Sequence, residues 1–245
     1  MQPAFGDLTT RGVEPLRTHL VSGVTSGIGK AIAARLASEG DRVVPVLRDP
    51  AQRSLFPDCP EVVICDFEDP KAVEVAFAGL QTPVDSFINC AGIMISKTLF
   101  EAPFEELARM VNVNLFSAMT AVARVREKLE PGGVIVLLSS QSAFKGSYDD
   151  AYAITKGAIH AMVKTLAPKL APRNRIICLA PGVTIGTRMT QDRAADDLEP
   201  YRQSIPLKRF ATPDEIAACV HFVLSPDAVS MTGCTIDING GNVLR

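Results

Sequence analysis

The sequence has no apolar stretch that approaches the ~20 consecutive residues needed to cross a bilayer. Its first residues do not follow the basic-then-apolar pattern of a secretory signal. It also contains no block of basic residues, and its formal net charge is −2. Nucleic-acid binding therefore has little electrostatic support. Together these absences predict a cytoplasmic protein that binds neither membranes nor nucleic acid.

Residues that commonly ligate metals are few and scattered. The three histidines, His19, His160 and His221, are far apart in the sequence. The six cysteines show no C-x-x-C spacing of a zinc or redox site. Most of these cysteines lie within apolar runs, where a free cysteine packs as a small hydrophobic side chain. The sequence therefore predicts no metal site.

The chain has 245 residues, of which 47% are hydrophobic and 21% charged, as expected of a folded protein. Its apolar patterns alternate between strand-like and helix-like segments, without an internal repeat or linker. This alternation predicts an α/β fold of three layers, a doubly wound parallel sheet of the Rossmann type, in a single domain. We assign residues 18–245 to this domain and 1–17 to a loosely held leader. Strands are expected over 18–23, 41–50, 61–70, 84–94, 132–140, 175–187 and 232–241, and helices over 25–40, 71–80, 104–129, about 152–170 and 212–225.

A glycine-rich turn lies between the first expected strand and helix. Gly23, Gly27 and Gly29 let the backbone turn sharply and approach a pyrophosphate, which would rest on the N-terminus of the following helix. A glycine triplet alone is a weak signal, but its position between strand and helix strengthens it. We expect the cofactor to contact these glycines together with Thr25, Ser26 and Ile28.

The ends of the second and third expected strands indicate which dinucleotide binds. An acid at the end of the second strand would favour NAD, whereas an arginine would accept the additional phosphate of NADP. Leu47 occupies the usual place of the acid and Arg48 follows it, although a shift of the alignment by one or two positions would place Asp49 there instead. We therefore favour NADP(H) and keep NAD(H) as possible. Asp66 and Phe67 are placed to meet the adenine, but Asp66 is also suited to capping the next helix.

A tyrosine and a lysine stand four residues apart, at Tyr152 and Lys156, in a run with helical spacing. Residues at i and i+4 share one face of a helix. A lysine cation favours the phenolate form and so would lower the pKa of the tyrosine. The apolar run just before this segment ends in Ser139 and Ser140. A strand that delivers a hydroxyl and a helix that delivers a phenol and an ammonium together predict a proton-transfer site.

Other candidate residues also follow expected strands, and ligands bind at the carboxyl ends of strands in such sheets. One group is Asn89, Ala91 and Gly92, and another is Pro181, Gly182 and Val183. Asn112 and Asn114 lie in the middle of an expected helix, where an amide needs a buried partner or a function. The polar stretch at about 186–206 is interpreted as a substrate lid.

Over residues 18–241 the chain resembles the short-chain dehydrogenase/reductase family. The resemblance lies in SGVTSGIG (22–29), NCAG (89–92), the Tyr152-x-x-x-Lys156 pair, APG (180–182) and TGCTIDINGG (232–241). The chain differs at three positions: Ser22 replaces the usual threonine, Cys90 replaces the second asparagine, and Asn239 replaces a common aspartate. Such order and spacing do not arise by chance.

The resemblance implies a role for each matching residue. Tyr152 would be the acid/base, with Lys156 as its pKa partner and a ligand of the cofactor ribose. Asn114 would help to hold a proton-relay water, while Asn112 would be structural. Ser140 would polarise the substrate, with Ser139 as its rival because the loop to Tyr152 is one residue short. Thr187 would contact the carboxamide, with Thr184 as its rival.

The expected activity is NAD(P)-dependent hydride transfer to or from a carbonyl or secondary alcohol. A 3-oxoacyl reductase, a sugar or polyol dehydrogenase and a secondary-metabolite ketoreductase all fit the sequence. A non-catalytic dinucleotide sensor and an epimerase or dehydratase remain as alternatives from other classes. The family also implies a homotetramer or dimer formed through the helices near 104–129 and 152–170, and the terminal NVLR could reach a neighbouring subunit.

Overall fold

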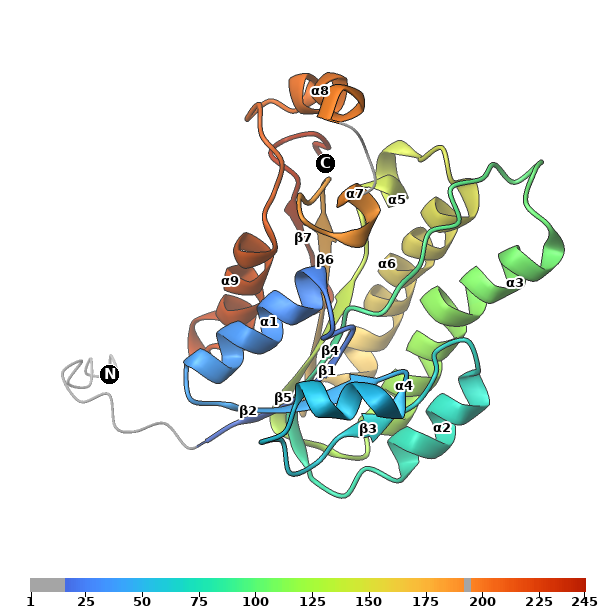
Figure 1. Ribbon diagram of the computed structural model, residues 1–245. Helices are drawn as coiled ribbons and strands as arrows, with labels where there is room; N and C mark the ends of the chain where they lie inside the picture. Colours follow the sequence, from blue (N-terminus) through green and yellow to red (C-terminus); the bar gives the residue numbers. More distant parts are fainter. Residues whose placement is uncertain (1–15, 192–194) are drawn as a thin grey trace, which may run out of the picture.

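The chain forms one seven-stranded parallel sheet with the strand order β3-β2-β1-β4-β5-β6-β7 (Figure 1). The computed structural model describes residues 16–191 and 195–245, and in 195–197 only the backbone. The order reverses direction next to β1, which confirms the predicted doubly wound α/β fold in a single domain. The strands are β1 (Thr18–Ser22), β2 (Arg42–Leu47), β3 (Val63–Ile64), β4 (Val84–Asn89), β5 (Leu129–Leu138), β6 (Arg175–Pro181) and β7 (Thr235–Ile238).

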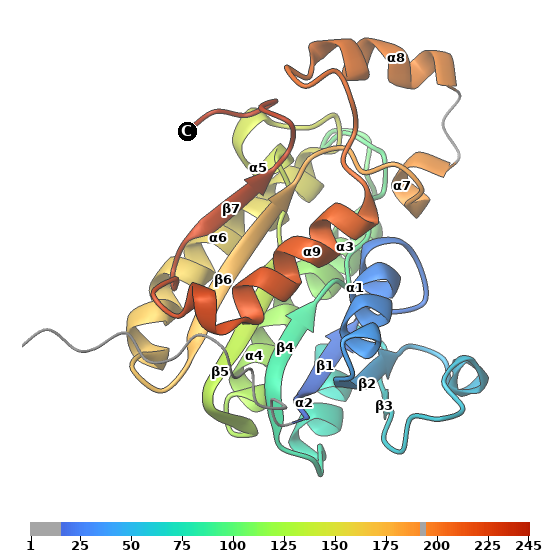
Figure 2. The ribbon, with the colours of Figure 1, turned by 90° about the vertical axis from the view of Figure 1, so that its left-hand side faces the viewer.

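Helices cover both faces of this sheet and make three layers (Figures 1 and 2). One face packs against α1 (Gly27–Ser38) and α9 (Pro213–Leu224). The other packs against α2 (Pro70–Ala78), α4 (Ser117–Val125) and α6 (Asp150–Leu170). The remaining elements are α3 (Phe104–Val111), α5 (Ser142–Lys145), α7 (Arg188–Gln191), α8 (Ala195–Ser204), the 3₁₀ helices η1 (Pro50–Leu55) and η3 (Pro226–Ala228), and the π-helical η2 (Asn112–Phe116).

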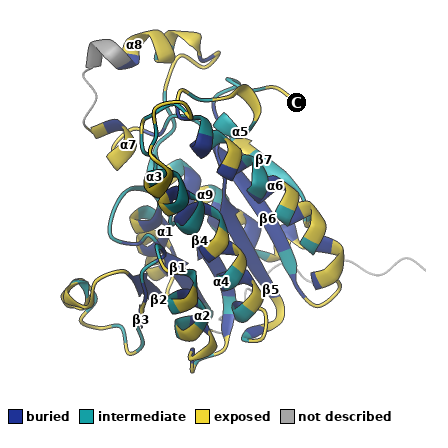
Figure 3. Ribbon diagram, turned by 90° about the vertical axis from the view of Figure 1, so that its right-hand side faces the viewer, coloured by how far each residue is buried: buried dark blue, intermediate teal, exposed yellow. Residues whose placement is uncertain are grey.

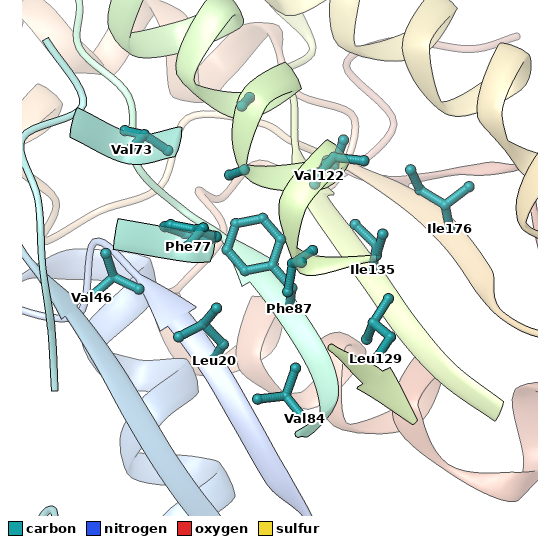
Figure 4. Packing of buried hydrophobic residues seen from close by; sticks show 14 of the residues in the cluster. Leu20, Val46, Val73, Phe77, Val84, Phe87, Val122, Leu129, Ile135 and Ile176 are labelled. Carbon is teal, nitrogen blue, oxygen red and sulfur yellow. The ribbon is translucent and has the colours of Figure 1, made fainter. Parts of the chain in front are cut away.

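The two-sided core follows from the alternation of side chains along each strand. In β1, Leu20 points to the face of α2 and α4, whereas Val21 points to the face of α1 and α9. On the first face Phe77 and Phe87 meet edge to face with ring centroids 5.3 Å apart (Figure 4). Strands β1, β2, β4, β5 and β6 are accordingly buried along most of their length, whereas the edge strand β7 is only partly buried (Figure 3). The carboxyl ends of the strands are thereby held at one edge, where the candidate site lies.

Two expected elements differ from the structure for local reasons. The strand expected over 61–70 is only Val63–Ile64, because Asp66 turns the chain by accepting a hydrogen bond from the Glu68 N–H at 2.9 Å. The helix expected over 104–129 is divided by η2, which places Asn114 against the loop after β4. By contrast, the helix expected over 212–225 forms as α9 and begins with a capping box of Thr212 and Glu215. The assignment of a leader to 1–17 falls mainly on residues outside the described part.

Candidate active site

The glycine turn between β1 and α1 forms the floor of the site. Gly23 and Gly27 have φ values of +70° and +54°, which side-chain-bearing residues rarely adopt. A Cβ at Gly29 would lie 2.3 Å from the carbonyl oxygen of Gly23, so only glycine fits there. In the described structure the side chain of Ser26 makes no capping hydrogen bond, so the first N–H groups of α1 remain available to an anion.

A cavity of about 400 Å³ opens above this turn and collects most of the predicted site residues. Those that line it are Gly23, Thr25, Ser26, Gly27, Ile28, Gly29, Ala91, Gly92, Ser139, Ser140, Tyr152, Lys156, Pro181, Gly182, Val183, Thr184 and Thr187. Most of them lie at or just after the carboxyl ends of β1, β4, β5 and β6, as the doubly wound topology requires, whereas Tyr152 and Lys156 come from α6. Segments far apart in the sequence therefore meet in one space.

A second cavity of about 150 Å³ adjoins the first and contains Arg48, Asp66 and Phe67. The residues that line both cavities are Gly23, Thr25, Ala91, Gly92 and Arg188. Two chambers that meet over a glycine turn suit an elongated ligand with a diphosphate in its middle. The residues present therefore fit a dinucleotide.

Two predicted residues, Asn89 and Asn114, line neither cavity. The side-chain oxygen of Asn89 accepts a hydrogen bond from the Ser22 hydroxyl at 2.6 Å, and that hydroxyl in turn accepts one from the Ala91 N–H. Asn89 therefore helps to hold the backbone of the cavity wall in place without lining the cavity itself. The Asn89 side chain is thus engaged by Ser22, and the predicted contact of Asn89 with the cofactor stays a prediction.

The Asn114 side chain is buried and links three elements. Its oxygen accepts a hydrogen bond from the Ile93 N–H at 2.8 Å, and its amide donates to the Ile93 carbonyl and to the Thr155 hydroxyl. The expected water-holding role of Asn114 stays a prediction. Asn112 donates to the Glu68 carbonyl at 3.2 Å, in agreement with the structural role expected of it.

Ser139 and Ser140 point in different directions, which separates the two candidates for the catalytic serine. The Ser139 hydroxyl donates to the Lys156 carbonyl and contacts His160, both at 2.8 Å, on the side of α6. The Ser140 hydroxyl accepts a hydrogen bond from the Ser142 N–H at 3.1 Å, and it lies near enough to the Tyr152 phenol to lower the pKa of that group. The geometry therefore favours Ser140, as predicted.

The pKa of Tyr152 is the property on which the structure differs most from the expectation. Burial raises this pKa to about 12, although the hydrogen bond with Ser140 opposes the shift. The net lowering of this pKa that was expected from Lys156 is not found, because desolvation of the phenolate is the dominant effect. Tyr152 is therefore a neutral phenol at physiological pH, which suits proton donation.

Lys156 is buried beside the phenol, with Nζ 5.6 Å from the Tyr152 ring centroid. Its ammonium donates to the Leu138 carbonyl at 2.9 Å, the one acceptor that the described residues offer it. Since an ammonium carries three N–H donors, the others remain available on the cavity side. Burial lowers the pKa of Lys156 to about 8, so its charge is sensitive to mildly alkaline pH.

Thr184 and Thr187, the rivals for the carboxamide contact, both line the cavity. The Thr187 hydroxyl donates to the Thr184 carbonyl at 3.0 Å, and the Thr184 hydroxyl donates to that of Gly182 at 3.1 Å. A Cβ at Gly27 would lie 3.3 Å from the Thr187 methyl, so Thr187 sits directly over the glycine turn. This position agrees better with a cofactor contact from Thr187.

Sequence reasoning missed two residues of the site, Asp149 and Arg188. Asp149 is fully buried and caps α6 by accepting a hydrogen bond from the Tyr152 N–H at 2.9 Å. An aspartate three residues before an apolar helical run is a recognisable cap signal, so this contact could have been found. Its bonds to the Ile95 and Ser96 N–H groups are long-range and left no such signal. Arg188 lines both cavities, but this position arises only in the tertiary fold and has no local signal in the sequence.

Among residues 16–191 and 195–245, no helix combines the length and the apolar character that a membrane span requires. The same residues contain no cluster of three or more His, Cys, Asp or Glu side chains with metal-binding geometry.

Comparisons with known proteins agree with this geometry. Residues 23–242 match the family model described as enoyl-(acyl carrier protein) reductase. The chain is 34% identical over 245 residues to the 3-oxoacyl-[acyl-carrier-protein] reductase MabA of Mycobacterium tuberculosis, covering 95% of this chain and 96% of that protein. It is 34% identical over 235 residues to L-xylulose reductase of Bos taurus, covering 92% and 96% respectively.

Among solved structures, a short chain dehydrogenase from Burkholderia cenocepacia in complex with NADP superposes with a TM-score of 0.81. It is 29% identical, and the match covers 93% of this chain and 97% of that one. The two-chambered site, the matching relatives and the shared fold lead to one conclusion. The chain belongs to the short-chain dehydrogenase/reductase family of NAD(P)-dependent oxidoreductases.

Proposed function

We propose that this protein reduces the carbonyl group of a small substrate, with NADPH as the preferred reductant. The observation that carries the proposal is the meeting of the Tyr152 phenol, the Ser140 hydroxyl and the Lys156 ammonium on the wall of a cavity above the glycine turn. The related structure that contains NADP supports the choice of cofactor class.

Each polar group then has a definite task. Ser140 donates a hydrogen bond to the carbonyl oxygen, and Tyr152 donates its proton to that oxygen as negative charge develops. When bound, NADPH supplies the hydride that the carbonyl carbon accepts. Lys156 directs its remaining N–H donors towards the cofactor ribose. The high pKa of Tyr152 keeps the phenol protonated before the reaction, as a proton donor must be.

The substrate class that the relatives support best is a 3-oxoacyl thioester, since the MabA relative is named for that activity. A sugar or polyol substrate is the second candidate, supported by the similarity to L-xylulose reductase. The test is to follow NADPH absorbance with acetoacetyl-CoA, L-xylulose and simple diketones. Turnover of at least one compound is expected. No turnover of any, with intact NADPH binding, would favour a dinucleotide sensor, while recovery of NADPH after substrate interconversion would indicate an epimerase.

Arg48 is expected to set the preference for NADPH, because it lines the smaller cavity beside Asp66 and Phe67. A guanidinium binds a phosphate through a fork of donors, so Arg48→Ala should raise the KM for NADPH by ~10-fold or more and leave the KM for NADH nearly unchanged. Steady-state kinetics with both cofactors provide the measurement, and Arg53→Ala in the nearby η1 is the control. Equal use of NADPH and NADH by the parent protein would contradict the assignment.

The affinity for NADPH should depend on the charge of Lys156. Its pKa is lowered to about 8 without ligand, and an anionic cofactor nearby would raise it. Affinity should therefore be constant below pH 8 and fall above it by up to about tenfold per pH unit. Enhancement of NADPH fluorescence measures the dissociation constant. Lys156→Met should bind weakly with no such dependence, and a flat profile for the parent would argue against the role.

Three further features belong to the proposal. Exposed apolar side chains on η2, α4 and α6, namely Phe116, Met119 and Ile154, support a homo-oligomer formed through these helices. Residues 186–206 are proposed as a substrate lid, supported by Met189, Leu198 and Tyr201 on the cavity wall, although 192–194 lie outside the described residues. A cytoplasmic location stays a prediction from the sequence.

A further inference from the structure

Residues 242–245 at the carboxyl end of the chain fold back onto α5 of the same chain. The Asn242 amide donates a hydrogen bond to the Gln141 side-chain oxygen at 3.0 Å. The Asn242 side-chain oxygen accepts one from Lys145 Nζ at 3.3 Å. One asparagine therefore holds both the start and the end of this short helix. The terminal residues, which the sequence suggested for a neighbouring subunit, here contact their own subunit.

Arg245 makes the second part of this contact. Its guanidinium carbon lies 4.1 Å from the centroid of the Phe144 ring, and its nitrogens donate to Asp237 Oδ2 at 2.7 and 2.9 Å. Because Asp237 belongs to β7, the arginine fixes Phe144 to the sheet. A cation is attracted to the face of an aromatic ring, so this contact adds to the ion pair. Arg245 thus anchors the middle of α5.

Phe144 also connects α5 to the catalytic helix. Its ring centroid lies 4.4 Å from that of His160. His160 also hydrogen-bonds Ser139 Oγ at 2.8 Å and Thr235 Oγ1 at 2.9 Å, and its Nδ1 lies 3.6 Å from Cys178 Sγ. The Ser139 hydroxyl in turn donates to the carbonyl of Lys156. The contacts of Phe144 therefore reach, through His160 and Ser139, the backbone that carries the catalytic lysine.

The position of α5 matters because this helix forms one wall of the larger cavity. Gln141, Ser142, Lys145 and Gly146 all line the cavity and directly follow Ser140. A single four-residue turn of helix is too short to be stable on its own. Its position therefore depends on the side chains packed against it, and Asn242 and Arg245 provide contacts to Gln141, Phe144 and Lys145.

We propose that residues 242–245 act as a clamp that holds α5 as the substrate-side wall of the cavity. Arg245 and Asn242 are positioning residues: they set the affinity for the carbonyl substrate without contacting the reacting atoms. The proposal rests on the carbonyl reductase function proposed above. Residues 242–245 line neither cavity, so we expect the affinity for the cofactor to depend on the clamp much less than the affinity for the substrate does.

Arg245→Ala and Asn242→Ala test the clamp. Each should raise the KM for the carbonyl substrate by ~5-fold or more while kcat stays within about twofold, because binding is lost and chemistry is kept. The dissociation constant for NADPH should not change. Arg245→Lys retains a cation for Asp237 and Phe144 and should recover part of the loss. Arg35→Ala, which removes another exposed ion pair at 2.9 Å on α1, is the matched control.

A second readout does not depend on activity. Hydrogen exchange of the peptide that contains residues 139–150 should be faster in Arg245→Ala than in the parent protein and in Arg35→Ala. Unchanged exchange would overturn the clamp itself. Faster exchange with an unchanged KM would overturn its effect on substrate binding. If the parent reduces no carbonyl compound, the proposed function fails, whereas the exchange measurement still decides whether the clamp exists.

Discussion

Replacement of Tyr152 by phenylalanine should lower carbonyl reduction by at least ~10³-fold, because general acid catalysis typically contributes 10²–10⁴-fold and Ser140 remains to bind the oxygen. The phenol is the group that donates a proton to the developing alkoxide, and burial keeps it protonated by raising its pKa to about 12. Phenylalanine keeps the ring that packs beside Met110 and Ala151, so the fold should be retained. Initial rates with saturating NADPH measure the effect.

Affinity for NADPH should change by less than about twofold in the same variant, because Lys156 and the glycine turn are intact. Tyr148→Phe is the matched control: this tyrosine also lines the cavity but is 66% exposed, and its loss should have little effect on turnover. If Tyr152→Phe kept more than about a tenth of the parent activity, another group would have to supply the proton.

The fold and most of the site were predictable because each depends on signals that are local in the sequence. Gly29 is an example: the backbone approach to Gly23 excludes any side chain, and this requirement is visible as a glycine between a strand and a helix. The sheet was predictable for the same reason, because the alternation of strand-like and helix-like apolar runs is also a local signal in the sequence. The convergence of strand ends then followed from topology alone.

The properties that were not predictable depend on burial and on contacts across the fold. The spacing of Tyr152 and Lys156 places both on one helix face, but it does not reveal that both are desolvated. Desolvation, and not the neighbouring cation, decides the direction of the tyrosine pKa. Likewise, a match to the family motif does not show that the Asn89 side chain is engaged by Ser22.

Asp149 illustrates the same limit and carries the largest expected effect on stability. Its carboxylate is fully buried and accepts hydrogen bonds from the N–H groups of Ile95, Ser96 and Tyr152 at 2.8, 2.9 and 2.9 Å. It thereby joins the start of the catalytic helix to the loop after β4. Ser96 lines the cavity with a φ of +57°, a conformation that needs such support.

Asp149→Ala should therefore lower the free energy of unfolding by at least ~3 kcal/mol, since an unsatisfied buried donor costs about 1–3 kcal/mol and three would lose their acceptor. Urea unfolding followed by circular dichroism measures the change. Asp149→Asn should lose less stability than Asp149→Ala, because its amide oxygen can still accept a hydrogen bond. It should remain less stable than the parent protein, because its NH₂ group gains no acceptor. Asp150→Ala is the matched control, since Asp150 accepts a single exposed hydrogen bond, from the Leu99 N–H at 2.8 Å. Equal losses for the Asp149 and Asp150 variants would show that the buried carboxylate does not hold the loop against α6.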